Sequence, residues 1–236
     1  MEFSGIQPFT AVDYPGKIAC IVFTAGCNFR CGFCHNPEFV LLSKIEKIKE
    51  SFIDEETVFR FLEKRKGLLQ GVVITGGEPT IHPGLTSFIT RVKEMGFSVK
   101  LDSNGYRPNV IQQLLDAELI DYIAMDIKGD REQYQELVEG CTNVEHLEKS
   151  VEFIMYSSIP YEFRTTLIKE IHTPPVLENI GQWISGAQNY YLQDFRPEQT
   201  LQPVYQTYHS FSQEEYTEAV SILNKYINNV TIRTTL

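Results

Sequence analysis

The sequence predicts an α/β fold built around a mainly parallel sheet. Short β-rich runs alternate with longer helical patterns from residue 18 almost to the end of the 236-residue chain, which is typical of repeated βα units. Six such units are too few for a closed eight-stranded barrel, so an open partial barrel or an open parallel sheet remains. The length and a hydrophobic content of 42% suit a single domain over residues 1–236.

Six strands are expected where β-branched and aromatic residues cluster. They cover Ile18–Phe23, Gly71–Ile74, Ser98–Leu101, Tyr122–Met125, Glu162–Leu167 and Tyr190–Phe195. Five crossover helices are expected at Asp54–Lys66, Leu85–Met95, Asn109–Ala117, Val144–Tyr156 and Pro174–Ile184. Asp54 and Thr173 stand where N-caps are expected, and Thr173 precedes a proline at the first helical position. The barrel core would therefore span about residues 18–197.

Two further segments are read from their patterning alone. Ser212 and Glu215 have the spacing of a capping box, which predicts a last helix, followed by a strand-like Val230–Arg233. These elements, over about residues 212–233, would follow the barrel. The run Lys44–Glu50 alternates in charge, and we expect it to be a solvated connection.

Composition excludes several classes of partner and compartment. The chain has 21 Lys and Arg against 31 Asp and Glu, a formal charge of −10, which is the wrong sign for broad binding to nucleic acid. No stretch reaches the roughly 20 apolar residues of a membrane span, and residues 1–10 lack a signal-peptide pattern. We therefore expect a cytoplasmic protein with no membrane partner. Five cysteines in such a compartment suit a metal site better than disulfides.

Three cysteines, Cys27, Cys31 and Cys34, follow the first predicted strand. Thiolates are soft ligands that select iron-sulfur clusters, zinc or copper. Structural zinc and electron-carrying clusters usually take four protein ligands, whereas a catalytic metal keeps one position open, so three thiolates favour a reactive site. The alternatives are a zinc site completed by Cys20, Cys141 or His35, or three buried thiols. We interpret Cys20 and Cys141 as small buried thiols.

Polar groups also follow the next three predicted strands. The second strand leads into Thr75-Gly76-Gly77-Glu78-Pro79, the third into Asp102-Ser103-Asn104-Gly105, and the fourth into Asp126-Ile127-Lys128. The two glycines allow close approach of the backbone to a ligand. Because the carboxyl ends of parallel strands meet at one rim, these groups would share a site suited to a zwitterionic ligand.

The cysteine spacing, with Phe33 before the last cysteine, resembles the signature of the radical S-adenosylmethionine superfamily. That resemblance implies an open partial (β/α)6 TIM-like barrel and a 4Fe-4S cluster held by Cys27, Cys31 and Cys34. It also implies that Phe33 lies beside the adenine of S-adenosylmethionine and that Gly76, Gly77 and Glu78 hold the cofactor's amino group. Such enzymes cleave the cofactor reductively to a 5'-deoxyadenosyl radical.

The Asp-x-Lys pattern at Asp126 and Lys128 resembles that of glycyl radical enzyme activases. The resemblance implies a carboxylate contact for Lys128 and, as a hypothesis, a monovalent cation. Its ligands would be Asp102, Ser103, Asp126 and the backbone carbonyl of Ala124. Arg164 and Arg196 would point to the same mouth and contact the cofactor's carboxylate or ribose. The five histidines show no ligand or catalytic spacing, and no role is assigned to them.

Four segments resemble the activating proteins of anaerobic ribonucleoside-triphosphate reductase: residues 9–17, 23–27, 34–38 and 192–197. The resemblance implies abstraction of a glycine Cα hydrogen in that partner, with a flavodoxin or ferredoxin-type electron donor. Asp13 and Lys17 would touch the partner or belong to a plain hairpin. The alternatives are activation of pyruvate formate-lyase or another glycyl radical enzyme, a small-molecule radical enzyme, or a zinc or electron-transfer module.

Overall fold

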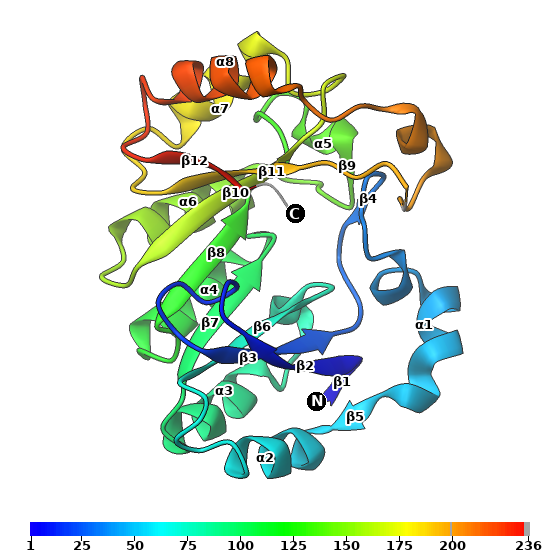
Figure 1. Cartoon of the computed structure of the whole chain (residues 1–236), viewed down its shortest axis with the longest axis vertical. Coiled ribbons are helices and arrows are strands. Elements are labelled where there is room, and N and C mark those ends of the chain that lie inside the picture. Colours follow the sequence, from blue (N-terminus) through cyan, green and yellow to red (C-terminus); the bar gives the residue numbers. More distant parts are fainter. Residues whose placement is uncertain (199, 234–236) are drawn as a thin grey trace.

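The computed structural model describes residues 1–198 and 200–233, and an eight-stranded sheet forms its centre (Figure 1). The strand order is β12-β11-β10-β8-β7-β6-β3-β2. All neighbours are parallel except β2, which pairs antiparallel with β3 at one edge. The bounds are β2 Gly5–Thr10, β3 Ala19–Thr24, β6 Gly71–Gly76, β7 Ser98–Ser103, β8 Tyr122–Asp126, β10 Tyr161–Leu167, β11 Tyr190–Asp194 and β12 Val230–Arg233. The six predicted strands are therefore confirmed, within two residues at each end.

The strand order decides between the two architectures that the sequence left open. From β3 to β12 each parallel strand pairs with the next one in the chain, so every right-handed crossover advances in the same direction. The crossover helices then all lie on one face of the sheet. In a doubly wound sheet the strand order reverses, and helices cover both faces. Figure 1 shows the sheet bent into an arc with α2, α3, α4, α6, α7 and α8 along its outer side. The architecture is the partial barrel.

A seventh parallel strand extends this barrel beyond its predicted end. The segment predicted to follow the barrel, Val230–Arg233, is β12, and it pairs with β11 from Tyr190 to Gln193. Helix α8, Gln213–Leu223, is the crossover that leads to it, and the predicted Ser212–Glu215 capping box is present. The barrel therefore runs to residue 233 instead of about 197, because the last helix and strand form one more βα unit.

The helices agree with the amphipathic patterns in the sequence. The longer ones are α2 Glu55–Glu63, α3 Leu85–Glu94, α4 Pro108–Asp116, α6 Glu145–Tyr156 and α7 Pro174–Trp183. Asp54 caps α2 by accepting a hydrogen bond from Thr57 N at 2.7 Å. Thr173 is the N-cap residue of α7, but its side chain makes no capping hydrogen bond, so the following proline sets the start of that helix.

One predicted connection is a helix. Lys44–Glu50 is predicted to be a solvated connection, and in the structure α1 spans Leu42–Ile48 and is followed by the 3-10 turn η2, Lys49–Ser51. None of the residues of α1 is buried. Lys and Glu have high intrinsic helix propensity, which charge alternation alone does not reveal. The segment is solvated, as expected, but it is helical.

Several short elements surround the rim of the barrel. Two small antiparallel ladders pair β1 with β5 and β4 with β9. Their bounds are β1 Glu2–Phe3, β5 Ile53–Asp54, β4 Arg30–Cys31 and β9 Val138–Glu139, and β9 directly follows α5, Tyr134–Leu137. The remaining 3-10 turns are η1 Pro37–Phe39, η3 Pro79–Ile81 and η4 Pro203–Thr207. The ladder between β4 and β9 fixes the backbone of one of the three clustered cysteines, because β4 carries Cys31.

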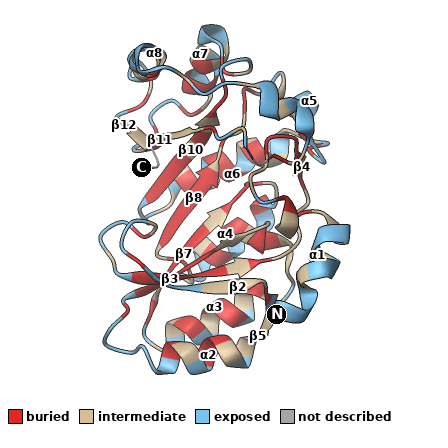
Figure 2. Cartoon of the chain, turned by 45° about the vertical axis from the view of Figure 1, so that its right-hand side comes forward, coloured by how far each residue is buried: buried red, intermediate tan, exposed pale blue. Residues whose placement is uncertain are grey.

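Burial separates the two faces of the sheet. Residues such as Val72, Leu101 and Ile123 belong to the large buried cluster that packs against the helices, and the strands are largely buried in Figure 2. Alternate strand residues turn to the concave side, where a smaller cluster contains Tyr14, Ala19, Ile21, Val73 and Tyr122. Toward the C-terminal ends of the strands, the concave face carries polar and charged side chains. Among the described residues, no helix is both long and apolar enough to cross a membrane.

Candidate functional site

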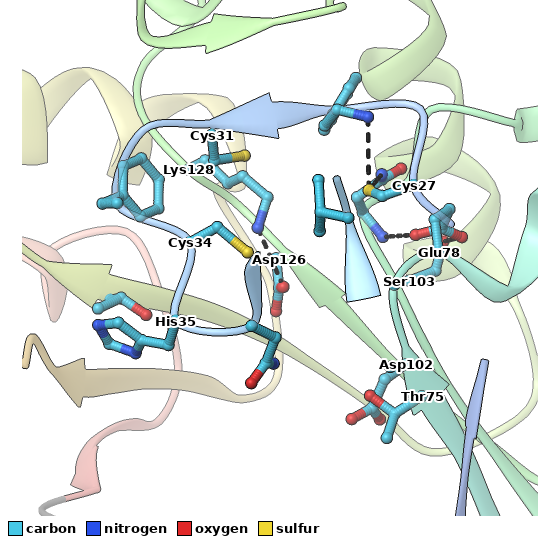
Figure 3. Close-up of a pocket in the computed structure, with 18 of the residues that line it drawn as sticks. Cys27, Cys31, Cys34, His35, Thr75, Glu78, Asp102, Ser103, Asp126 and Lys128 are labelled. Carbon is cyan, nitrogen blue, oxygen red and sulfur yellow. Dashed lines mark hydrogen bonds and ion pairs between the residues drawn. The ribbon is translucent and has the colours of Figure 1, made fainter. Parts of the chain in front are cut away.

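A cavity of about 290 Å³ lies at the C-terminal ends of the strands (Figure 3). The cysteine loop forms one wall, and residues at or just after the C-terminal ends of β6, β7 and β8 form another. Of the residues singled out in the sequence, it is lined by Cys27, Cys31, Phe33, Cys34, Gly76, Gly77, Glu78, Asp102, Ser103, Asp126, Lys128 and Arg164. Four separate strand ends therefore meet in one site, as expected for a parallel barrel. Arg196 is exposed and is not among the lining residues.

The three clustered cysteines are free thiols on one side of the cavity. Cys31 lies in β4 opposite Val138 of β9, so a backbone ladder holds the middle of the loop. Burial raises the pKa of the Cys31 thiol to about 12 and that of the Cys27 thiol to about 11. Such thiols become thiolates at neutral pH only when a metal replaces the proton. Cys20 and Cys141 are buried elsewhere and do not line the cavity, as predicted.

A second segment covers the cysteine loop from the outside. Gln202 N donates to Gly32 O at 2.9 Å, and the ring of Tyr205 in η4 meets Phe33 edge-on at 5.8 Å between centroids. A Cβ atom at Gly32 would lie 2.2 Å from the Tyr205 ring, so only glycine fits there. Phe33 is buried between the cavity and this cover.

The Gly76-Gly77 turn packs directly on the start of the cysteine loop. Gly77 N donates to Thr24 O at 2.9 Å, and Glu78 N donates to Gly26 O at 2.8 Å. A Cβ atom at Gly77 would lie 2.0 Å from the Gly26 carbonyl oxygen. Gly76 also has a φ of +115°, which side chains disfavour. The glycines therefore set the distance between this turn and Cys27.

Glu78 ties the turn to the end of β7. Its Oε1 accepts from Thr80 N at 3.1 Å and from Ser103 Oγ at 2.8 Å, and its Oε2 accepts from Asn104 N at 2.7 Å. The carboxyl is buried, and this burial raises its pKa while the hydrogen bonds oppose the rise. Among the described residues, Oε2 accepts from Asn104 N and has lone-pair capacity for a second donor, and Glu78 lines the cavity from which a ligand ammonium would approach.

Charged side chains alternate across the polar part of the concave face. Arg164 Nη1 lies 2.9 Å from Asp102 Oδ2, and Arg164 Nη2 lies 2.9 Å from Asp126 Oδ1. Lys128 Nζ lies 3.2 Å from Asp126 Oδ2, the ion pair marked in Figure 3. Although burial opposes ionisation, Lys128 and Arg164 lower the pKa of Asp126 to about 2. Both aspartates are therefore carboxylates at neutral pH.

Sequence reasoning missed two residues that support these groups. Lys100 lies two positions before Asp102 in β7, so both side chains share the concave face, and its Nζ lies 2.6 Å from Asp102 Oδ1. His172, to which no role was assigned, lies with Nε2 at 3.3 Å from the backbone oxygen of Lys128. The period of two along β7 could have revealed Lys100, whereas nothing in the sequence places His172 beside Lys128.

The donor set fits an iron-sulfur cluster and a zwitterionic cofactor. The free thiols of Cys27, Cys31 and Cys34 all line the cavity, and thiolates are the usual ligands of iron-sulfur clusters. Carboxylates and the Lys128 ammonium on the facing wall complement an amino group and a carboxylate, respectively.

Comparison with known proteins agrees with this geometry. The Radical SAM superfamily matches residues 21–170, a segment that contains the cysteine loop and the ends of β6, β7 and β8. The chain therefore belongs to the radical SAM superfamily, whose members use a 4Fe-4S cluster and S-adenosylmethionine. The predicted radical SAM fold is thereby confirmed, and Cys27, Cys31 and Cys34 lie within the matched segment.

Within the superfamily, the chain groups with glycyl-radical enzyme activating enzymes. It is 32% identical over 237 residues to "Putative glycyl-radical enzyme activating enzyme MJ1227" of Methanocaldococcus jannaschii, which covers 98% of this chain and 95% of that one. It is 34% identical over 130 residues to the pyruvate formate-lyase-activating enzyme of Listeria monocytogenes, about half of each chain. A solved structure, Streptococcus suis SuiB bound to precursor peptide SuiA, superposes with a TM-score of 0.62 at 13% identity. That match covers 89% of this chain and 47% of SuiB, so this chain spans about half its length.

Proposed function

We propose that this chain reductively cleaves S-adenosylmethionine and uses the 5'-deoxyadenosyl radical to take a hydrogen from the Cα of a glycine in a partner enzyme. The favoured partner is anaerobic ribonucleoside-triphosphate reductase. The observation that carries the proposal is the rim cavity, where three free thiols face a wall of paired carboxylates and cations. That arrangement supports a cluster on one side and an amino acid moiety on the other.

Each residue in the cavity has a proposed part. Cys27, Cys31 and Cys34 hold the 4Fe-4S cluster, which supplies one electron to the sulfonium of the cofactor. Lys128 binds the methionine carboxylate, and Glu78 with the backbone of the Gly76-Gly77 turn binds the amino group. Phe33 contacts the adenine. Arg164 holds Asp102 and Asp126 in place through its two ion pairs.

A protein substrate is favoured by the relative that matches nearly the whole chain, because its name describes activation of a glycyl radical enzyme. Anaerobic ribonucleoside-triphosphate reductase is favoured by the resemblance in residues 9–17, 23–27, 34–38 and 192–197. The hairpin of β2 and β3 also exposes Phe9, at the end of β2, and Val12, in the turn, by 59% and 79%. Asp13 and Lys17 lie on the same turn, which is a hairpin as the alternative expectation stated, and we propose that this hairpin contacts the partner.

The test is an anaerobic activation assay with reconstituted enzyme, S-adenosylmethionine and a flavodoxin or ferredoxin-type donor. Electron paramagnetic resonance should detect a glycyl radical on the reductase, with 5'-deoxyadenosine formed in matching amount. Cys31→Ala should abolish both products, and Cys141→Ala, which removes a buried thiol outside the cavity, should leave both. Formation of 5'-deoxyadenosine that consumes a small molecule without any partner protein would refute the proposal.

Activation of pyruvate formate-lyase is the second candidate, because the Listeria monocytogenes activating enzyme matches half of this chain. The same assay separates the two by presenting each partner alone and then both together. A radical that forms on pyruvate formate-lyase and not on the reductase would establish the second candidate and reject the first.

A further inference from the structure

The place that the activase resemblance assigns to a monovalent cation is already filled by cationic side chains. Asp102 Oδ1 and Oδ2 lie 2.6 Å from Lys100 Nζ and 2.9 Å from Arg164 Nη1. Asp126 Oδ1 and Oδ2 lie 2.9 Å from Arg164 Nη2 and 3.2 Å from Lys128 Nζ. Every carboxylate oxygen of the two proposed cation ligands therefore has a positively charged partner within the chain.

Ser103, a third proposed ligand of the cation, already makes hydrogen bonds within the chain. Ser103 Oγ donates to Glu78 Oε1 at 2.8 Å and accepts from Gly105 N at 3.1 Å. Its hydroxyl therefore already makes two hydrogen bonds within the chain, although Ser103 lines the cavity beside Asp102. Two carboxylates thus face three protein cations, and these three positive charges would repel a metal cation placed beside the carboxylates. The predicted cation ligands do not fit a bound monovalent cation.

Of the three cationic side chains, Lys100 is the one that does not line the cavity. Its side chain is 1% exposed, and burial of an ammonium is costly unless it is paired. Its described charged partner is Asp102, and the Tyr122 ring lies beside it at 5.8 Å from Nζ to the centroid. Lys128 and Arg164 also contact Asp126, and Lys128 lines the cavity, whereas Lys100 is not among the lining residues. Lys100 therefore acts on the site through Asp102.

We propose that the Lys100 ammonium is a tethered replacement for a dissociable monovalent cation, and that it keeps Asp102 ionised and in place beside Arg164. Binding of S-adenosylmethionine is then independent of Na⁺ and K⁺. Lys100 is a positioning residue, because it contacts Asp102 and not the cavity. The inference rests on the cofactor site of the proposed function, but it is independent of which partner carries the glycine.

The first test measures the dissociation constant of S-adenosylmethionine for the reconstituted full chain in NaCl, KCl or choline chloride at equal ionic strength. The wild-type constant should agree among the three salts to within about twofold. In choline chloride, Lys100→Met should weaken binding about tenfold, the effect of losing one charge-assisted hydrogen bond, and Na⁺ or K⁺ should restore most of it. Lys66→Met is the matched control, because Lys66 forms an exposed ion pair with Glu63, and it should behave as wild type.

The second test needs no cofactor and follows thermal unfolding of the full chain in the same salts. The wild-type midpoint should not distinguish Na⁺ or K⁺ from choline, whereas Lys100→Met should unfold earlier and be stabilised by the small cations. A specific, saturable response of the wild-type protein to Na⁺ or K⁺ overturns the proposal even if the variant fails to fold. A folded Lys100→Met that matches wild type in choline, or whose lost binding neither cation restores, also overturns it. Failure of the proposed function would appear instead in the glycyl radical assay, with cofactor binding unchanged.

Discussion

Substitution of His172 should change how the stability of the protein depends on pH. The imidazole is 1% exposed and lies between two backbone segments. Ile168 N donates to Nδ1 at 2.9 Å, which is shorter than the 3.3 Å from Nδ1 to Ile168 O. Nδ1 is therefore the acceptor, and Nε2 carries the proton and donates to Lys128 O at 3.3 Å. Only the neutral ring makes this pair of bonds, so protonation would break the contact that holds the backbone of Lys128.

The magnitude follows from the pKa. Burial lowers the pKa of His172 from 6.5 to about 4. Because the unfolded chain keeps the ordinary value, it binds the proton first as the pH falls, and folding becomes less favourable between these two values. The contribution of His172 to the free energy of unfolding should decrease by about 2 kcal/mol from about pH 8 to about pH 5, and by about 3 kcal/mol at about pH 4.

His172→Gln is the informative variant, since the amide keeps a donor for Lys128 O but does not titrate in this range. Urea unfolding of the full chain at several pH values should show a pH dependence flatter by about 2 kcal/mol than that of wild type over the same interval. Parallel curves for His172→Gln and wild type would refute the assigned tautomer and burial effect.

Three further results are expected. Cys31→Ala should abolish iron incorporation on anaerobic reconstitution while Cys141→Ala retains it; equal iron content in the two variants would contradict the ligand assignment. Glu78→Gln should lower the free energy of unfolding by about 2 kcal/mol, because the amide keeps one acceptor oxygen and its NH2 group must then face either Asn104 N or Thr80 N, both of which donate; an unchanged urea midpoint would show that these bonds contribute nothing. Gly32→Ala should displace Tyr205, whose ring lies 2.2 Å from the new Cβ position, and accelerate hydrogen exchange over residues 200–208. Tyr205→Ala in the same chain should relieve the clash, and failure to do so would contradict the packing described.

The parallel strands were recognisable in the sequence because both faces of the sheet are buried, one against the helices and the other against side chains inside the barrel. Such strands read as continuous apolar runs, as in β3 and β6. Element ends were less exact, since strand and helix termini depend on which neighbour supplies the next hydrogen bond. The sequence analysis did not place β12 in the barrel. A short apolar segment joins a sheet only through its hydrogen bonds to a neighbouring strand, and β12 pairs with β11 after the crossover through α8.

The sequence by itself determined the contiguous part of this site: three cysteines in one loop, a Gly-Gly turn, and polar residues directly after strands. Local spacing suffices for these features because a parallel sheet brings all its carboxyl ends to one rim. Only the tertiary structure decided which charges pair. Three neighbouring strands supply these side chains, Lys100, Asp102, Arg164 and Asp126, which contact one another only when the strands pair in the sheet. The predicted cation site was read from residue types one at a time, whereas its occupancy depends on the electrostatic balance of all the strands together.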